Sequence, residues 1–133
     1  MRHGLIALAF PFLLAMPGLA AVAAGSLPAQ SSSVAGVTVK ATPRTLAAPV
    51  WEFELVFDTH TQDLNDDPAK SASLHAAGGA GAAPLAWQGD PPGGHPRKGV
   101  LRFKAMTPKP AALELRLQRA GESSPRVFRW PLK

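Results

Sequence analysis

Apolar and polar side chains alternate with a period of two along most of the chain after residue 36, and this alternation constrains the fold more than any other feature. In the run 51–57 every odd position carries a large apolar residue, and Glu52 and Glu54 occupy even positions. Successive side chains of a β-strand point to opposite faces, so this run predicts a strand with one buried face. Similar runs predict further strands over 37–42, 98–105, 111–118 and 125–132. The residues expected to fill the core are Trp51, Phe53, Leu55, Leu101, Phe103, Leu113, Leu115 and Leu117.

Turn-forming segments rich in Gly, Pro, Asp and Asn separate these runs. Two weaker runs, 72–76 and 84–89, bring the expected total to six or seven short strands. So many short strands in a domain of about 100 residues predict two packed antiparallel sheets. The predicted fold class is therefore all-β, an immunoglobulin-like antiparallel β-sandwich. The likeness concerns architecture only, because the chain has no cysteine for the disulfide of true immunoglobulin domains.

The first 24 residues have the pattern of a secretory signal peptide. A short basic start, MRHG, precedes an apolar stretch that ends in small residues. Pro11 and Pro17 interrupt the stretch and no basic cluster follows it, so an uncleaved membrane anchor is the less favoured alternative. The sequence thus predicts a signal peptide over 1–24, a flexible lead-in over 25–35 and a β-sandwich domain over 36–133. The expected location is the bacterial periplasm or the medium, with no stable membrane span after signal cleavage.

Composition and charge restrict the classes of function. The chain carries 14 Lys and Arg against 9 Asp and Glu, a formal net charge of +5. The basic residues are scattered over strand-like runs, and export argues against nucleic acid as a partner. The expected partner is an unknown envelope protein or an acidic cell-envelope polymer. No cysteine is present, no serine lies in a nucleophile elbow and no phosphate-binding loop occurs. We therefore expect neither an enzyme nor a cofactor.

Two segments, 57–70 and 87–103, concentrate polar residues that could form a site. The first has four aspartates and one histidine within ten residues, and the second combines Trp87, Asp90 and His95 with four glycines and three prolines. Loops carried by a rigid sandwich are common places for binding residues. The binding hypothesis comprises Asp58, His60, Asp63, Trp87, Asp90, His95 and Arg97.

A structural role explains the second segment equally well, and we favour it. Proline fixes φ, glycine permits positive φ, and Asp90 can bond the backbone two residues further on, so the segment suits a turn that leads into a strand. We expect the two segments to pack together at one end of the sandwich. In this arrangement His60 would donate to Asp90, and Arg97 would pair with Asp58 or Asp63.

A metal site is the alternative to this structural pairing. His60 and His95, with Asp58 or Asp90, would suit zinc or copper(II), because these metals take imidazole and carboxylate ligands. No closely spaced pair of histidines supports such a site. A calcium loop is not expected either, since the acidic run 63–67 is not followed by the glycine that an EF-hand requires.

The segments DTHTQDL, at 58–64, and WQGDPPGGHPRKGVLRF, at 87–103, resemble a group of uncharacterised bacterial exported proteins. In that group the first motif reads DTHS-x-DL and the second W-E-GDPPGGHHR-x-GVLRF, and the likeness spans residues 37–132. The resemblance implies no activity. Gln88 stands where the group has Glu, and Pro96 where it has a second His. The matching residues are Asp58, Thr59, His60, Asp63, Leu64, Trp87, Gly89, Asp90, Pro91, Pro92, Gly93, Gly94, His95, Arg97, Gly99, Leu101 and Phe103.

Overall fold

Nine strands and one short helix make up residues 27–133, the part of the chain that the computed structural model describes. The predicted signal peptide lies outside this part. The elements are β1 (Gln30–Val34), β2 (Val37–Thr45), β3 (Val50–Thr59), α1 (Pro68–Ser71), β4 (Ala72–Ala76), β5 (Gly81–Ala82), β6 (Ala86–Gly89), β7 (Arg97–Lys104), β8 (Ala112–Leu117) and β9 (Arg126–Pro131).

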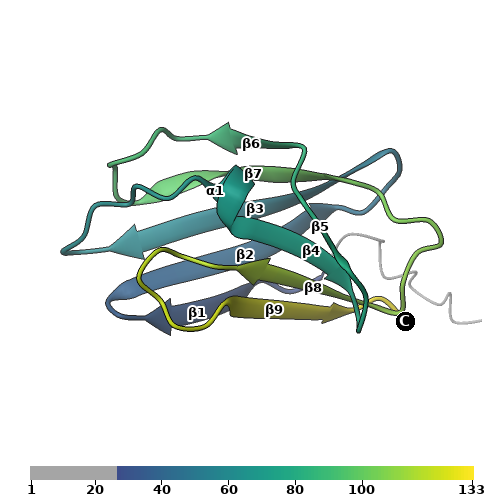
Figure 1. The fold of residues 1–133 in the computed structure, drawn as a ribbon. Helices are drawn as coiled ribbons and strands as arrows, with labels where there is room; N and C mark the ends of the chain where they lie inside the picture. The colour runs from purple at the N-terminus through teal and green to yellow at the C-terminus, as the bar shows by residue number, and fades with distance from the viewer. Residues whose placement is uncertain (1–26) are drawn as a thin grey trace, which may run out of the picture.

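The strands form two antiparallel sheets that pack face to face (Figure 1). One sheet has the order β1-β2-β3-β7-β6, and the other has the order β5-β4-β8-β9. The strands β2 to β9 can be given the immunoglobulin strand names A, B, C, C′, D, E, F and G in chain order. The first sheet then has the order A-B-E-D after β1, and the second has the order C′-C-F-G. This is the strand arrangement of an immunoglobulin sandwich. The additional strand β1 pairs with the outer side of strand A. The predicted all-β, immunoglobulin-like sandwich is confirmed.

The core lies between the sheets and includes all of the residues predicted to fill it, together with others such as Leu74, Phe128 and Trp130. All eight residues expected in the core are buried, each with at most 2 % of its surface exposed. Phe53 contacts Phe103 edge to face with ring centroids 5.8 Å apart, and it also lies 5.7 Å from the Trp130 ring. Offset and edge-to-face contacts of this kind stabilise an aromatic pair beyond its buried area. Aromatic side chains of both sheets therefore interlock across the interface.

Two strands were not predicted. β5 has only two residues, Gly81–Ala82, and lies in the glycine-rich segment between the predicted strands 72–76 and 84–89. β1 occupies part of the predicted flexible lead-in, so that prediction is wrong for residues 30–34. Its segment, QSSSV, shows no alternation of apolar and polar residues, and it is held by pairing with β2 from Gln30↔Ala41 to Val34↔Val37. The stabilisation comes from the neighbouring strand, which local sequence does not reveal.

The helix α1 is a single turn between β3 and β4. The Asp67 carboxylate accepts a hydrogen bond from the Ala69 N–H at 3.1 Å, and Pro68 begins the helix, where its missing N–H costs nothing. Asp67 is thus the N-cap of this turn, which leads directly into β4. Within residues 27–133 the structure contains no helix long and apolar enough to cross a membrane.

The connections between strands gather at the two ends of the sandwich (Figure 1). The β1–β2 turn and the connections β3–β4, β6–β7 and β8–β9 reach the end drawn on the left, and the C-terminus lies at the other end. In immunoglobulin naming these three connections are the B–C, D–E and F–G loops. The end that collects them therefore brings together segments that are far apart in the sequence.

Candidate functional site at one end of the sandwich

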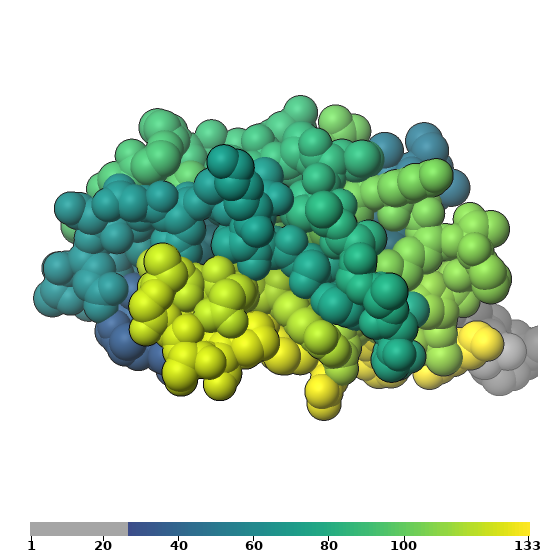
Figure 2. Space-filling view, viewed as in Figure 1, coloured from purple at the N-terminus to yellow at the C-terminus, as the bar shows by residue number. Residues whose placement is uncertain are grey.

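Three loops and one turn meet at this end, which we call the loop end. They are the first loop (60–67), the second loop (90–96), the third loop (118–125) and the turn at 35–36. The Gly93 N–H donates to the Leu64 carbonyl at 3.1 Å and so joins the second loop to the first. The Gln62 side-chain amide donates to the Ala35 carbonyl and joins the first loop to the turn. Figure 2 shows the yellow-green third loop packed directly beside the teal first loop.

Arg97 lies buried beneath the first two loops, with 2 % of its surface exposed. Its Nε donates to the Asp90 carbonyl at 3.1 Å, and its Nη1 donates to the carbonyls of Leu64 and Asp66. The guanidinium carbon also lies 5.6 Å from the centroid of the Trp87 ring, a distance at which cation–π attraction operates. Arg97 thereby connects the first and second loops, because it donates hydrogen bonds to backbone carbonyls of both.

Arg119 links the first loop to the third. Its Nε and Nη2 donate to the two carboxylate oxygens of Asp66 at 2.7 and 2.9 Å, and each side chain is 8 % exposed. The third nitrogen, Nη1, lies 3.4 Å from Glu122 Oε2. A two-point pair between a planar guanidinium and a carboxylate fixes the relative orientation of both groups. The position of the first loop is therefore coupled to that of the third.

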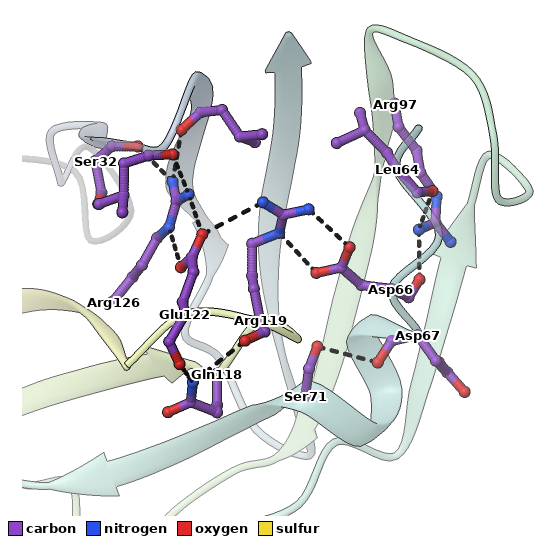
Figure 3. Close-up of polar contacts among 12 residues, drawn as sticks. Ser32, Leu64, Asp66, Asp67, Ser71, Arg97, Gln118, Arg119, Glu122 and Arg126 are labelled. Carbon is purple, nitrogen blue, oxygen red and sulfur yellow. Dashed lines mark hydrogen bonds and ion pairs between the residues drawn. The ribbon is translucent and has the colours of Figure 1, made fainter. Parts of the chain in front are cut away.

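Arg126 completes the network on the opposite side of Glu122 (Figure 3). Its Nε and Nη2 donate to the Glu122 carboxylate at 2.9 and 2.7 Å. Its remaining hydrogen bonds go to the carbonyls of Ser32, Val34 and Val37, at 2.7, 3.1 and 2.9 Å. Arg126 therefore attaches the third loop to β1 and to the start of β2, and its own side chain is 1 % exposed.

The two carboxylates of this network stay ionised at neutral pH. Burial by itself raises the pKa of Asp66, but the hydrogen bonds and the charge of Arg119 outweigh it and hold that pKa below its ordinary value. The hydrogen bonds from Arg126 are the main reason that the pKa of Glu122 is lowered, against the opposing effect of burial. Asp66 in turn raises the pKa of Arg119. The chain Arg126–Glu122–Arg119–Asp66 is thus a set of charged pairs.

Trp87 and two glycines explain much of the second motif structurally. The indole of Trp87 lies over Gly99, where an added Cβ would come within 2.5 Å of the ring, and a Cβ on Gly89 would come within 2.4 Å of the Gly99 Cα. The ring also contacts Phe57 edge to face at 6.3 Å. Asp90 bonds the backbone with its carboxylate, which accepts from the Lys98 N–H at 2.9 Å. These contacts shape the hairpin that carries the second loop.

The predicted packing of the two segments is present, but through different atoms. Arg97 bonds backbone carbonyls and forms no ion pair with Asp58 or Asp63 among the described residues, so that prediction is wrong. The predicted hydrogen bond from His60 to Asp90 is also absent from this part of the chain, because the Asp90 carboxylate bonds the backbone of β7.

Four residues of the binding hypothesis are exposed at the loop end, and their side chains form no hydrogen bond or ion pair among the described residues. They are Asp58, His60, Asp63 and His95. Of the other three, Arg97 is buried and Trp87 is half-buried, whereas Asp90 is exposed and uses its carboxylate to accept from the Lys98 N–H. Among residues 27–133 no group of three or more His, Cys, Asp or Glu side chains lies close enough to hold a metal ion. The structure therefore does not assemble the alternative metal site of His60, His95, Asp58 and Asp90.

Two neighbouring hollows open on either side of the third loop. The first has a volume of about 430 Å³ and is lined by polar groups of the first and third loops, among them Asp63 and Asn65. The second has a volume of about 450 Å³ and is lined by Val34, Val127 and three serines. The hollows share Ala35, Gly121 and Glu122 in their linings. They give the loop end a concave surface beside the exposed residues named above.

Arg97 was expected at the site, but its burial was not predicted, and Arg119, Arg126 and their carboxylates were missed from the sequence, although a signal exists for the arginines. Arg97, Arg119 and Arg126 each lie in phase with the inward positions of a predicted strand, such as Phe128 and Trp130 after Arg126. An arginine at a core-facing position at the end of a strand indicates a buried cation that needs acceptors. No comparable signal marks Asp66 or Glu122, because both lie in loops.

Comparison with known proteins found no match: the sequence fits no protein-family model, no curated protein and no solved structure.

Proposed function

We propose that this protein is an exported, non-enzymatic β-sandwich module of the bacterial envelope that binds a partner protein through its loop end. One observation carries the proposal: three buried arginines hold all three loops and the β1–β2 turn in one arrangement. Arg97 and Arg126 bond backbone carbonyls of the segments that they position, and Arg119 bonds the carboxylates of Asp66 and Glu122. Loops that are ordered before binding lose little conformational entropy when a partner docks, which favours affinity.

The contacts with the partner fall to side chains that the fold itself does not use. Asp58, His60, Asp63 and His95 are exposed at the loop end. The two hollows beside the third loop add concave surface, and one of them is lined by the exposed residues Val34 and Val127, which are 43 % and 41 % exposed. Two exposed valines beside polar side chains suit a protein partner, because a protein interface combines an apolar centre with a polar rim.

Export is supported by the N-terminal sequence pattern. We expect the mature chain to begin between Val22 and Gly25, after the small residues that end the apolar stretch. Intact-mass measurement of protein recovered from the cell envelope tests this. A protein that retains Met1 in the membrane fraction would show instead that the segment serves as an anchor.

Site-specific photocrosslinking in living cells tests the loop end as a binding surface. A photoreactive residue replaces His60 or His95 at the loop end, or the exposed residues Ala47 or Lys109 at the opposite end. We expect a discrete adduct of the same mass from both loop-end positions, because one partner would cover both. The two control positions should give none.

A second variant makes the test specific to surface chemistry. Replacing Asp63 with Ala in the chain labelled at His95 should weaken the adduct while leaving thermal stability unchanged, because Asp63 is exposed and forms no ion pair among the described residues. Equal adducts from both ends, or none from either loop-end position, would contradict the proposed surface.

A further inference from the structure

The outer face of the five-stranded sheet carries more cations than anions. Alternation along β2, β3 and β7 directs their even-numbered side chains to this face, away from the core. The cations are Lys40, Arg44, Lys98, Arg102 and Lys104, and the carboxylates are Glu52, Glu54 and Asp58. We call this surface the basic face. It is distinct from the loop end, which only Asp58 borders.

The central carboxylate of the basic face lies below its cations. The Glu54 side chain is 15 % exposed, whereas Arg44 and Lys98 beside it are 54 % and 60 % exposed. Arg44 bonds Glu54 directly, and the Lys98 Nζ lies 3.7 Å from the same carboxylate oxygen. The hydrogen bond from Arg44 is the main reason that the pKa of Glu54 is lowered. At the position of Glu54 an approaching molecule therefore meets ammonium and guanidinium groups first, whereas Glu52 is as exposed as Arg102, with which it pairs, and Asp58 is exposed at the border of the face.

Other cations of this face have no carboxylate partner within the described residues. Lys40 and Lys104 are exposed and form no ion pair there. Lys40 and Lys98 stand on either side of Val56, two strands apart, which is a spacing of about 10 Å. A chain of anions that crosses the sheet between these lysines would pass closer to each of them than the screening length of about 8 Å at physiological salt, so it would interact with both at once.

The chemistry of the face favours a flexible polymer over a lipid surface. The exposed large apolar residues of the described chain are Val34, Leu85 and Val127, and none occupies an outward position of β2, β3 or β7. Stable binding to a membrane surface generally needs apolar side chains that enter the lipid in addition to charge. The apolar residues at outward positions, Val50, Val56 and Val100, are only partly exposed. An array of cations without fully exposed apolar side chains fits an extended polyanion.

We propose that the basic face binds an acidic polymer of the cell envelope, through the carboxylate or phosphate groups of that polymer. This second surface goes beyond the proposed function of the loop end and does not depend on it. It would hold the module on the polymer while the loop end remains free for a partner protein.

Binding of two soluble probes tests the proposal. Polyglutamate supplies carboxylates and polyphosphate supplies phosphates, so the pair distinguishes the two anion chemistries. We expect the mature protein to bind at least one of them in low-salt buffer, with affinity that falls steeply as salt rises toward about 0.15 M. The double variant Lys40→Gln/Lys98→Gln should lower that affinity roughly tenfold or more, because each lysine near an anionic surface contributes about a factor of five.

A matched variant separates the basic face from net charge alone. Lys70→Gln/Lys109→Gln removes the same two charges from α1 and from the β7–β8 loop, both exposed positions, and should stay within about twofold of the wild type. Arg44 keeps Glu54 paired in the first variant, so both variants should fold with unchanged thermal stability.

Three results would overturn the proposal. The wild type could bind neither polymer, both double variants could lose affinity equally, or vesicles rich in phosphatidylglycerol could bind more tightly than either polymer through the same lysines. The last result would identify a lipid surface as the partner. Crosslinking from His60 and His95 is independent of these lysines, so failure here leaves the loop-end proposal separately testable.

Discussion

At the scale of single residues, three arginines occupy positions that the alternation assigns to the core. Burying a charged group is costly unless it is paired and hydrogen-bonded. Arg119 and Arg126 meet this condition through Asp66 and Glu122, and Arg97 meets it through backbone carbonyls and the Trp87 ring. Each arginine bonds segments that are distant in the sequence, and it thereby fixes the positions of these segments relative to one another.

Replacing Arg126 tests how strongly this network holds the fold. Arg126→Met leaves the Glu122 carboxylate with Arg119 alone and leaves three buried or partly buried carbonyls without their donor. Breaking a buried pair from one side costs about 3–5 kcal/mol. We expect a loss of that size in the free energy of unfolding, measured with urea.

The matched control is Arg129→Met, from the same strand. Arg129 pairs with Glu114 at the surface, and its side chain is 71 % exposed, so its loss should cost no more than about 1 kcal/mol. Adding Glu122→Gln to Arg126→Met should recover part of the stability, since it removes the uncompensated charge. Equal losses of unfolding free energy in Arg126→Met and Arg129→Met would show that the buried network does not contribute more to stability than a surface ion pair.

The same network predicts how stability depends on pH. The folded-state pKa values of Asp66 and Glu122 are lowered from their ordinary values of 3.8 and 4.5. A lowered pKa stabilises the fold fully above the unfolded-state value, and this stabilisation is lost as the pH falls through the folded-state pKa. Urea unfolding should therefore show a marked loss of stability from pH 5 toward pH 2 to 3. Asp66→Asn should be less stable at pH 7 and should lose less across that range, and parallel curves would argue against this assignment.

At the scale of elements, the β6–β7 hairpin illustrates how a motif can serve structure. Trp87 covers the facing glycines of both strands, and Arg97 lies against the same ring. The glycines are required because any side chain there would occupy the space of the indole. The favoured structural role for this part of the segment is thus supported by its contacts, and the outermost loop residues are left exposed.

Gly99→Ala tests this packing. Its Cβ would lie 2.5 Å from Trp87 Cζ2 and 2.7 Å from the Gly89 Cα, and the second of these is backbone, which cannot turn aside. Overpacking of this kind costs about 1–3 kcal/mol. We expect such a loss of stability, with a change in tryptophan fluorescence as the indole is displaced.

Gly94→Ala in the loop of the same hairpin is the control. A Cβ at Gly94 would meet no atom within 4 Å, and its φ lies outside the range that favours glycine. Its substitution should change stability by no more than about 0.5 kcal/mol. A neutral Gly99→Ala would mean that the indole has another position available to it.

At the scale of the whole molecule, β1 closes the sandwich along one side. The Gln30 side chain bonds both the N–H and the carbonyl of Arg129 in β9, so it spans from one sheet to the edge of the other. The Trp130 indole N–H donates to the Pro28 carbonyl at 2.8 Å. Arg126 adds its bonds to β1 carbonyls. The segment expected to be a flexible lead-in is therefore part of the domain.

Removing β1 should destabilise the whole domain. A chain that begins at Gly36 loses the Ser32 and Val34 carbonyls that Arg126 bonds, and hydrogen bonds to a charged group contribute about 1.5–3 kcal/mol each. We expect it to be less stable by about 2–4 kcal/mol, after allowance for water replacing part of the lost bonding. A chain that begins at Leu27 keeps β1 and should match the mature protein in urea unfolding. Equal stability of the two truncated chains would show that β1 does not contribute to the stability of the domain.

The sequence alone determined seven of the nine strands, eight of the core residues and the architecture, because alternation is a local property. A run such as 51–57 buries one face wherever it is placed, and enough such runs leave two packed sheets as the stable solution. β1 shows the limit of this reasoning, since its polar segment QSSSV becomes a strand only beside β2. The two segments of the candidate site were also correctly expected to meet at one end.

Only the tertiary structure decided which atoms hold that end together. Asp66 and Arg119 are 53 positions apart, and Arg126 is 94 positions from Ser32. Pairing between such distant groups depends on where strands end after the sheets have packed, and it leaves no period or spacing in the chain. An exposed aspartate and a buried, paired one look alike in a loop sequence. Asp63 is exposed and Asp66 is buried and paired because Arg119 contacts only Asp66, and this contact forms only in the folded sandwich.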